Sequence, residues 1–141
     1  MQATATEIQL VYTAGSGDYS LWAAGIAGFT DTAAGSDPDH DGLTNFEEYA
    51  FGLDPTKGSG VAPVTAPNKL AGTFTYTRRK QSLTGLIYTH KSSTNLGGWT
   101  AFTPIAATSN GGDPVETITV TVPPALLAEP KLFLRVEAAA P

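Results

Sequence analysis

The sequence predicts a mostly β protein in which antiparallel strands form a β-sandwich, preceded by a small element of two helices. Two observations favour this class. After about residue 71, apolar and polar residues alternate in short runs separated by turn residues, with no helical pattern between the runs. Before residue 57, the large apolar residues instead recur at helical spacings around an acidic segment. We therefore expect two parts, residues 1–56 and residues 57–141, packed together as one unit.

The first expected element is a strand over residues 6–13, in which alternate side chains face the same way. Residues 15–17, two glycines and a serine, end this strand. A short helix over residues 19–29 should follow, and the two glycines within it make it dependent on packing. Its large apolar side chains fall on one side: Trp22, Ile26 and Phe29.

A second helix is expected over residues 44–51, directly behind the acidic segment. Gly52 is suited to the end of this helix, and the Asp54–Pro55 pair prevents its continuation. The apolar residues of this region keep the spacing of one buried stripe: Leu43, Phe46, Ala50 and Leu53.

A linker-like or edge segment over residues 56–70, which is rich in proline and glycine, leads into the second part of the chain. Strands separated by turns follow it, the first two joined as a hairpin. The expected strands cover residues 73–77, 86–91, 99–102, 117–122 and 131–137. Short strands with frequent turns and no helix between them predict an antiparallel sandwich of the immunoglobulin or fibronectin kind.

The acidic segment, residues 37–48, places oxygen-bearing residues at the spacing of a twelve-residue calcium loop. Gly42 stands at the sixth position, where such a loop turns sharply. Calcium takes about six to eight oxygen ligands, and a glutamate at the last position supplies two of them. The predicted ligands are the side chains of Asp37, Asp39, Asp41, Asn45 (directly or through water) and Glu48, and the carbonyl group of Leu43.

A different interpretation of this segment is an acidic, solvated turn that caps the next helix. The aspartates at alternate positions, with Glu47 and Glu48 close behind, would then repel one another without a counterion. Magnesium fits less well than calcium, because it retains its waters and rarely uses a cage made only of protein ligands. Calcium is therefore the predicted ion.

The composition excludes several classes of protein. The chain has no cysteine, which rules out disulfides and thiolate metal sites and makes calcium a suitable means of stabilising a secreted protein. No apolar run is long enough to span a membrane, and the first residues lack the pattern of a signal peptide. The net charge of -5 is uneven, because every Lys and Arg lies after residue 56. Nucleic acid is a poor partner, since the one basic cluster, residues 78–80, fits a solvated hairpin turn.

The run from Asp37 to Pro55 resembles the single-loop calcium motifs of dockerins and thrombospondin type-three repeats. Taken with Trp22 and with the strand patterns from Phe74 to Val136, it is similar over residues 19–137 to a module found at the C-terminal end of large secreted bacterial proteins. This resemblance implies an exported, non-catalytic accessory module attached to glycan-acting or adhesive domains. It also implies the six ligand roles given above.

The chain departs from these motifs in three respects. His40 stands where such loops commonly have glycine, and a positive φ there strains a histidine less than a β-branched residue. No helix runs directly into Asp37, which Pro38 follows, so the segment is not a complete helix–loop–helix hand. Dockerins carry two loops and this chain carries one, which argues against cohesin binding.

No catalytic machinery is predicted. The only histidines are His40, among the calcium ligands, and His90, which we expect at the surface or edge of a strand. No nucleophile motif accompanies them, and the glutamates outside the loop are scattered over different strands. We expect a non-enzymatic, calcium-stabilised module of a secreted or cell-surface bacterial protein, in contact with the neighbouring domains of its parent protein.

Two further functions remain open. A carbohydrate-binding module would bind polysaccharide on exposed aromatic rings, namely Trp99 and Phe102 with Tyr76 or Tyr88; the alternative for Trp99 is a place in the core. A surface filament would form if the strand over residues 6–13 added to the sheet edge of another copy, whereas that strand could equally belong to its own sheet.

Overall fold

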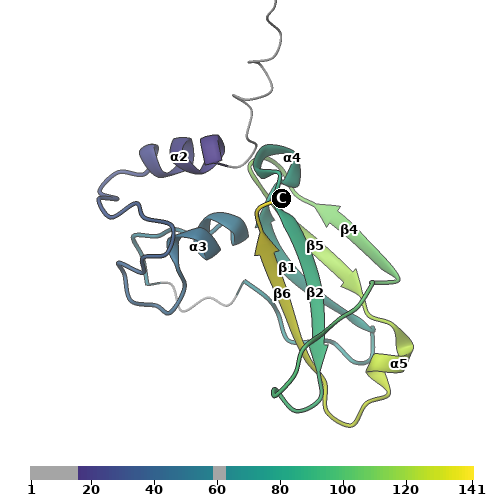
Figure 1. Ribbon diagram of the computed structural model, residues 1–141. Helices are drawn as coiled ribbons and strands as arrows, with labels where there is room; N and C mark the ends of the chain where they lie inside the picture. The colour runs from purple at the N-terminus through teal and green to yellow at the C-terminus, as the bar shows by residue number, and fades with distance from the viewer. Residues whose placement is uncertain (1–15, 59–62) are drawn as a thin grey trace, which may run out of the picture.

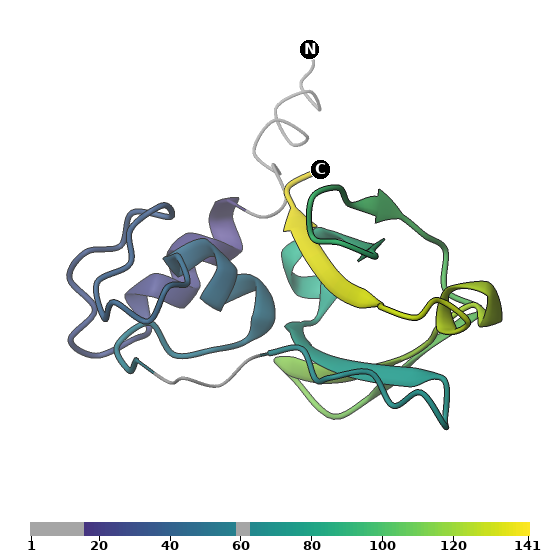
Figure 2. The same ribbon diagram turned by 90° about the horizontal axis from the view of Figure 1, so that it is seen from below.

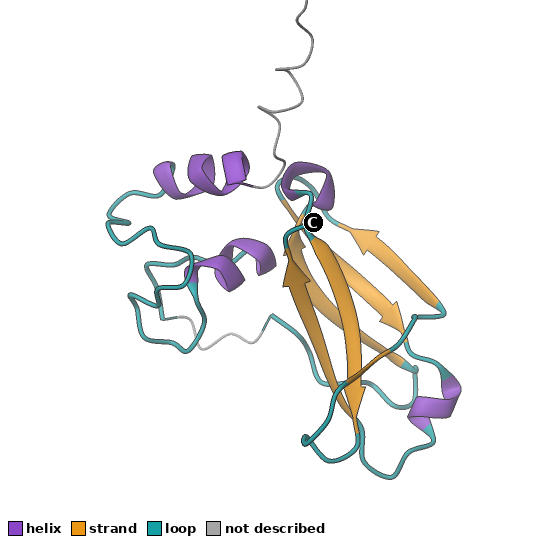
Figure 3. Cartoon of the chain, in the orientation of Figure 1, coloured by secondary structure: helices purple, strands orange, loops and turns teal. Residues whose placement is uncertain are grey.

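The computed structural model describes residues 16–58 and 63–141, so the strand expected over residues 6–13 lies outside the described residues. Short helices at the N-terminal side precede two antiparallel sheets of three strands each (Figures 1 and 3). The helices are α2 (Ser16–Ala24), α3 (Asn45–Phe51), α4 (Gln81–Thr84) and α5 (Pro124–Leu127). The strands are β1 (Thr73–Arg79), β2 (Ile87–Ser93), β3 (Thr100–Ala101), β4 (Ala106–Asn110), β5 (Val115–Thr121) and β6 (Phe133–Ala139).

The two sheets have the strand orders β1-β5-β4 and β3-β2-β6. In the first sheet Tyr76 pairs with Ile118, and in the second His90 pairs with Val136. Alternate residues of β1 are buried, as the period of two predicts, because one face of the strand is covered and the other faces water.

The core contains residues from both sheets. The ring of Tyr76 on β1 lies 6.3 Å from the ring of Tyr88 and 5.7 Å from the ring of His90, both on β2. The buried apolar residues form one cluster: Tyr49, Ala50, Phe51, Phe74, Tyr76, Leu86, Ile118, Val120, Val122 and Val136. Three of them come from α3, so the helical element shares the core of the sheets.

The helical element is fastened to the sheets by side-chain hydrogen bonds as well as by burial. Figure 2 shows α2 and α3 on one side of both sheets. The Tyr88 hydroxyl donates to the carbonyl of Ala50 at 2.8 Å, and the Thr77 hydroxyl donates to the carbonyl of Phe51 at 2.8 Å. The last carbonyls of α3, which have no partner within the helix, are thereby satisfied by one strand from each sheet.

Several elements differ from expectation. The first helix ends at Ala24, and the chain reaches a positive φ of 84° at Gly28, so the glycines stop this helix rather than weaken it. The hairpin expected between the first two strands is wrong: β1 and β2 belong to different sheets and are connected through the short helix α4. His90 lies in the middle of β2 with its ring toward Tyr76, so its expected place at the surface or strand edge is wrong. The sequence of β2 alternates like that of any half-buried strand, so it did not show that His90 would lie against the core.

Candidate metal centre

The start of α3 determines where the acidic side chains point. Thr44 has an extended backbone, and its side chain accepts a hydrogen bond from the backbone N–H of Glu47. The Glu47 carboxylate in turn accepts from the backbone N–H of Thr44 at 2.8 Å. This capping box begins the helix at Asn45 and engages Glu47 at the surface, while Glu48, the next residue, is fully buried.

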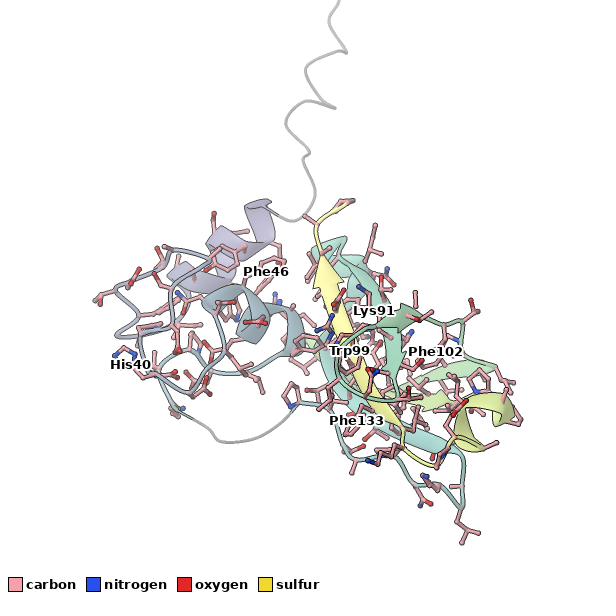
Figure 4. All side chains as sticks on the ribbon, turned by 60° about the horizontal axis from the view of Figure 1, so that its bottom comes forward. His40, Phe46, Lys91, Trp99, Phe102 and Phe133 are labelled. Carbon is pink, nitrogen blue, oxygen red and sulfur yellow. The ribbon has the colours of Figure 1, made fainter. Side chains whose placement is uncertain are left out.

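The loop before α3 winds around its own carboxylates. The backbone N–H groups of Asp41 and Gly42 donate to the two carboxylate oxygens of Asp37, at 3.3 and 3.1 Å. The backbone N–H of Leu43 donates to Asp41 at 2.9 Å. Two residues adopt positive φ, 61° at His40 and 96° at Gly42, and Figure 4 shows His40 on the outer side of the loop. The strained conformation considered for His40 is therefore present, and its side chain stays in solvent.

Three carboxylates converge inside this loop. One oxygen each from Asp37, Asp39 and Asp41 lies within 4.8 Å of the other two, and all three residues are half-buried. Such a cluster could hold a metal ion. Carboxylates this close repel one another. The hydrogen bonds from the loop backbone offset this repulsion only in part, and a bound cation would offset the rest.

Glu48 supplies the most informative feature of the site. It is 0% exposed, and within the described residues neither of its carboxylate oxygens has a hydrogen-bond partner. Burial, and then the charges of Asp39, Asp41 and Asp37, raise the pKa of Glu48 to about 7. A buried, unpaired carboxylate beside other carboxylates is strongly unfavourable, and a bound cation would satisfy it. Glu48 therefore fits the twelfth position of a calcium loop, although the three-aspartate group does not include it.

The nearby basic side chains do not meet this need. Arg79 pairs with Asp18 at 3.1 Å, and Lys57 pairs with Asp54. The ion pairs formed among residues 16–58 and 63–141 do not reach Glu48. One oxygen of Asp39 is also buried without a hydrogen-bond partner in the same part of the chain. The atoms available as metal ligands are oxygens of carboxylate, amide and carbonyl groups, which suit a hard cation.

Asn45 has a role that the sequence did not indicate. Its side-chain N–H groups donate to the carbonyls of Asp31, at 2.9 Å, and Ala33, at 2.7 Å, so it fastens the preceding segment to the first turn of α3. Its side-chain oxygen is buried and has no hydrogen-bond partner among the described residues, which leaves that oxygen to an ion or a water. The sequence indicated only that Asn45 has the spacing of a calcium ligand. It did not indicate these two hydrogen bonds, because both carbonyls belong to an irregular loop.

The four aromatic residues considered for sugar binding do not form one surface. Tyr76 is 1% exposed in the core, and the ring of Tyr88 lies under the guanidinium of Arg78 and beside the rings of Phe51 and Tyr76. Trp99 is half-buried beneath the guanidinium of Arg135 and is not part of the buried core cluster. Trp99 and Phe102 do lie together, as lining residues of one groove.

No protein-family model matches this sequence, and comparisons with curated proteins and with solved structures also find no match. Among the described residues, no helix has the length and apolar character needed to cross a membrane. Function must therefore be inferred from the acidic site and from the surfaces of the sheets.

Proposed function

We propose that this chain is a non-catalytic, calcium-binding accessory module of a secreted or cell-surface bacterial protein, in which calcium stabilises the fold. One observation carries the proposal: the Glu48 carboxylate is fully buried and unpartnered beside a three-aspartate cluster. Folding this carboxylate into the protein without a cation would cost several kcal/mol. A divalent ion removes that cost and simultaneously relieves the repulsion among the aspartates.

The ligands assigned to calcium are the predicted ones. The side chains of Asp37, Asp39 and Asp41 provide one oxygen each, Glu48 provides two, and the Leu43 carbonyl and the Asn45 amide complete the set, the amide directly or through water. Calcium is favoured over magnesium because the site consists of protein oxygens and tolerates a high ligand number. A transition metal is less suited, because no cysteine exists and the one histidine of the loop points outward.

Calcium would act on the whole chain through α3. Glu48 and Asn45 belong to this helix, and the carbonyls at its other end accept hydrogen bonds from Tyr88 and Thr77 on the two sheets. Ordering the loop therefore orders the helix, and the helix fills the end of the core. We propose that residues 1–56 and 57–141 fold as one unit on this basis, and that the two sheets pack as a sandwich of the immunoglobulin or fibronectin kind.

A secreted location agrees with this use of calcium. Extracellular calcium modules bind with dissociation constants on the order of 10⁻⁴ to 10⁻³ M, and we expect a single loop without a partner loop to fall in that range. A chain without cysteine must be stabilised outside the cell by something other than disulfides. The partners proposed for the module are the neighbouring domains of its parent protein.

Thermal unfolding in calcium and in EGTA tests the proposal. Calcium at 100 times its dissociation constant should stabilise the protein by about 2.7 kcal/mol, which corresponds to a rise in Tm on the order of 10 °C for a chain of this size. Magnesium at the same concentration, the matched control, should produce a much smaller rise. Identical melting curves in excess calcium and in EGTA would contradict the proposal.

A further inference from the structure

An open groove of ≈ 790 Å³ lies on the sheet half of the molecule, far in sequence from the acidic loop. Its lining runs from the end of β2, at Ser92, through β3 to Phe102, and it also includes Leu126, Glu129 and Leu132. The lining combines the aromatic residues Trp99 and Phe102 with the hydroxyl and amide groups of serine, threonine and asparagine side chains. Glu129 is the one charged residue among the lining residues.

The indole of Trp99 is held in place by charged side chains of the neighbouring strands. The guanidinium carbon of Arg135 lies 4.5 Å from the centre of the Trp99 ring. Arg135 also pairs with Glu137, which pairs with Lys91 across the strands at 2.6 Å. Figure 4 shows Lys91 and Trp99 on the same side of the second sheet. The ring therefore has a defined orientation before any ligand arrives.

The loop that carries Trp99 is fixed by its own side chains. The Ser93 hydroxyl accepts from the backbone N–H of Leu96 at 2.9 Å, and the Asn95 side-chain oxygen accepts from the backbone N–H of Gly97 at 2.8 Å. Leu96 adopts a positive φ of 65° within this turn. A loop that is already ordered loses little entropy on binding, which is a property of a preformed site.

We propose that this groove binds a neutral polysaccharide, with a sugar ring stacked on Trp99 and sugar hydroxyls bonded to Glu129 and Asn95. The C–H groups of a pyranose carry slight positive charge and suit the negative face of an aromatic ring. Anionic ligands are disfavoured because the lining has a carboxylate and no basic side chain. An apolar peptide is disfavoured because it would bury the hydroxyl and amide groups of the lining without partners.

The test combines affinity electrophoresis with fluorescence. Gels would contain hydroxyethylcellulose, laminarin or galactomannan as neutral polysaccharides, and polygalacturonate as the anionic comparison. The variants are Trp99→Ala and Glu129→Gln, and the control is Leu70→Ala, which removes a fully exposed apolar side chain outside the groove. Because the chain has two tryptophans, the Trp22→Phe protein reports Trp99 alone in a fluorescence titration with the same glycans.

We expect at least one neutral polysaccharide to retard the protein and to change the emission of Trp99. Trp99→Ala should weaken retardation by roughly tenfold or more, because it removes the aromatic face on which the sugar ring is proposed to stack. Glu129→Gln should weaken it less, and Leu70→Ala should leave it unchanged. If Trp99→Ala also lowers the Tm in calcium, its loss of binding could reflect destabilisation of the fold. Glu129 is exposed, so Glu129→Gln should leave the fold intact and still tests the groove.

Three results would overturn the proposal. The first is no binding to any neutral polysaccharide of the panel. The second is retardation by polygalacturonate alone. The third is retardation by a neutral glycan that both groove variants leave unchanged.

Discussion

Two neighbouring glutamates, Glu47 and Glu48, have opposite roles at the start of α3. Glu47 is exposed and completes the capping box with Thr44. Glu48 is buried with both oxygens unpartnered in the described part of the chain. The difference arises because neighbouring side chains of a helix point about 100° apart, so that one faces solvent while the other faces the interior. A substitution at each position therefore makes a matched pair.

Glu48→Gln should change stability in opposite directions with and without calcium. In calcium, the loss of a bidentate ligand should weaken affinity by roughly tenfold or more and bring the Tm toward its value in EGTA. In EGTA at pH 8, the variant should melt higher than the unmodified protein, because a neutral amide replaces a buried charge whose pKa is raised to about 7. Scanning calorimetry in both buffers measures this.

The control for this experiment is Glu47→Gln, because glutamine at this position preserves a capping box. Its calcium-dependent rise in Tm should equal that of the unmodified protein. A Glu48→Gln protein that is destabilised equally in both buffers would show that Glu48 supports the fold without any ion.

His90 should make the protein less stable in mild acid. Burial, and then the charge of Arg78, lower the pKa of His90 below its usual 6.5. The unfolded chain then binds a proton more readily than the folded one, so stability is complete above about pH 6.5 and is lost as the pH falls below it. His90→Phe, which suits the surrounding aromatic rings, should flatten the fall in Tm between pH 7.5 and 5.5 relative to the unmodified protein. A parallel fall in both proteins would contradict the assignment.

Elements with local signals could be predicted from the sequence, and elements without them could not. Helix α3 begins one residue from the expected start, because Thr44, Glu47 and Gly52 mark its ends in the sequence itself. Strand β4 was not predicted. All its residues are exposed, so its sequence lacks the alternation of apolar and polar residues that marks a half-buried strand. The strand expected over residues 99–102 is shorter, Thr100–Ala101, and the Trp99 ring just before it lies against the guanidinium of Arg135.

The same limit applies to the candidate site. The spacing of residues in the loop predicted the three-aspartate cluster, because its members, Asp37, Asp39 and Asp41, are close neighbours in the sequence. It could not predict that Asn45 would donate to the carbonyls of Asp31 and Ala33 or that Tyr76 would be buried in the core. Those facts depend on contacts between segments far apart in the sequence, which period and composition do not encode.

Gly52 and Gly28 provide a matched test of how α3 meets the first sheet. Both have positive φ, 74° and 84°, so alanine at either should cost about 1–2 kcal/mol in backbone strain. An added Cβ at Gly52 would lie 2.7 Å from a methyl carbon of Val115, whereas at Gly28 it would meet nothing within 4 Å. Gly52→Ala should therefore cost about 1–3 kcal/mol more than Gly28→Ala in chemical denaturation. Equal costs would mean that α3 does not pack there.

At the scale of the whole molecule, the helical element and the sheets share one core cluster and are joined by hydrogen bonds from Tyr88 and Thr77. We therefore expect a single cooperative unfolding transition in calcium. The Trp99→Phe protein reports the helical element through Trp22, and the Trp22→Phe protein reports the sheets through Trp99. Their fluorescence melting curves, each corrected for its own stability, should coincide with the calorimetric transition. Two separate transitions in saturating calcium would contradict the single unit.

The proposed function depends most on one ion bound between Glu48 and the loop aspartates. A crystal structure at high resolution, grown in excess calcium and measured for anomalous scattering, tests this directly. The result expected is one calcium peak with its oxygen ligands at about 2.3–2.6 Å, including both oxygens of Glu48. A water molecule or no density among those oxygens, in crystals saturated with calcium, would contradict it.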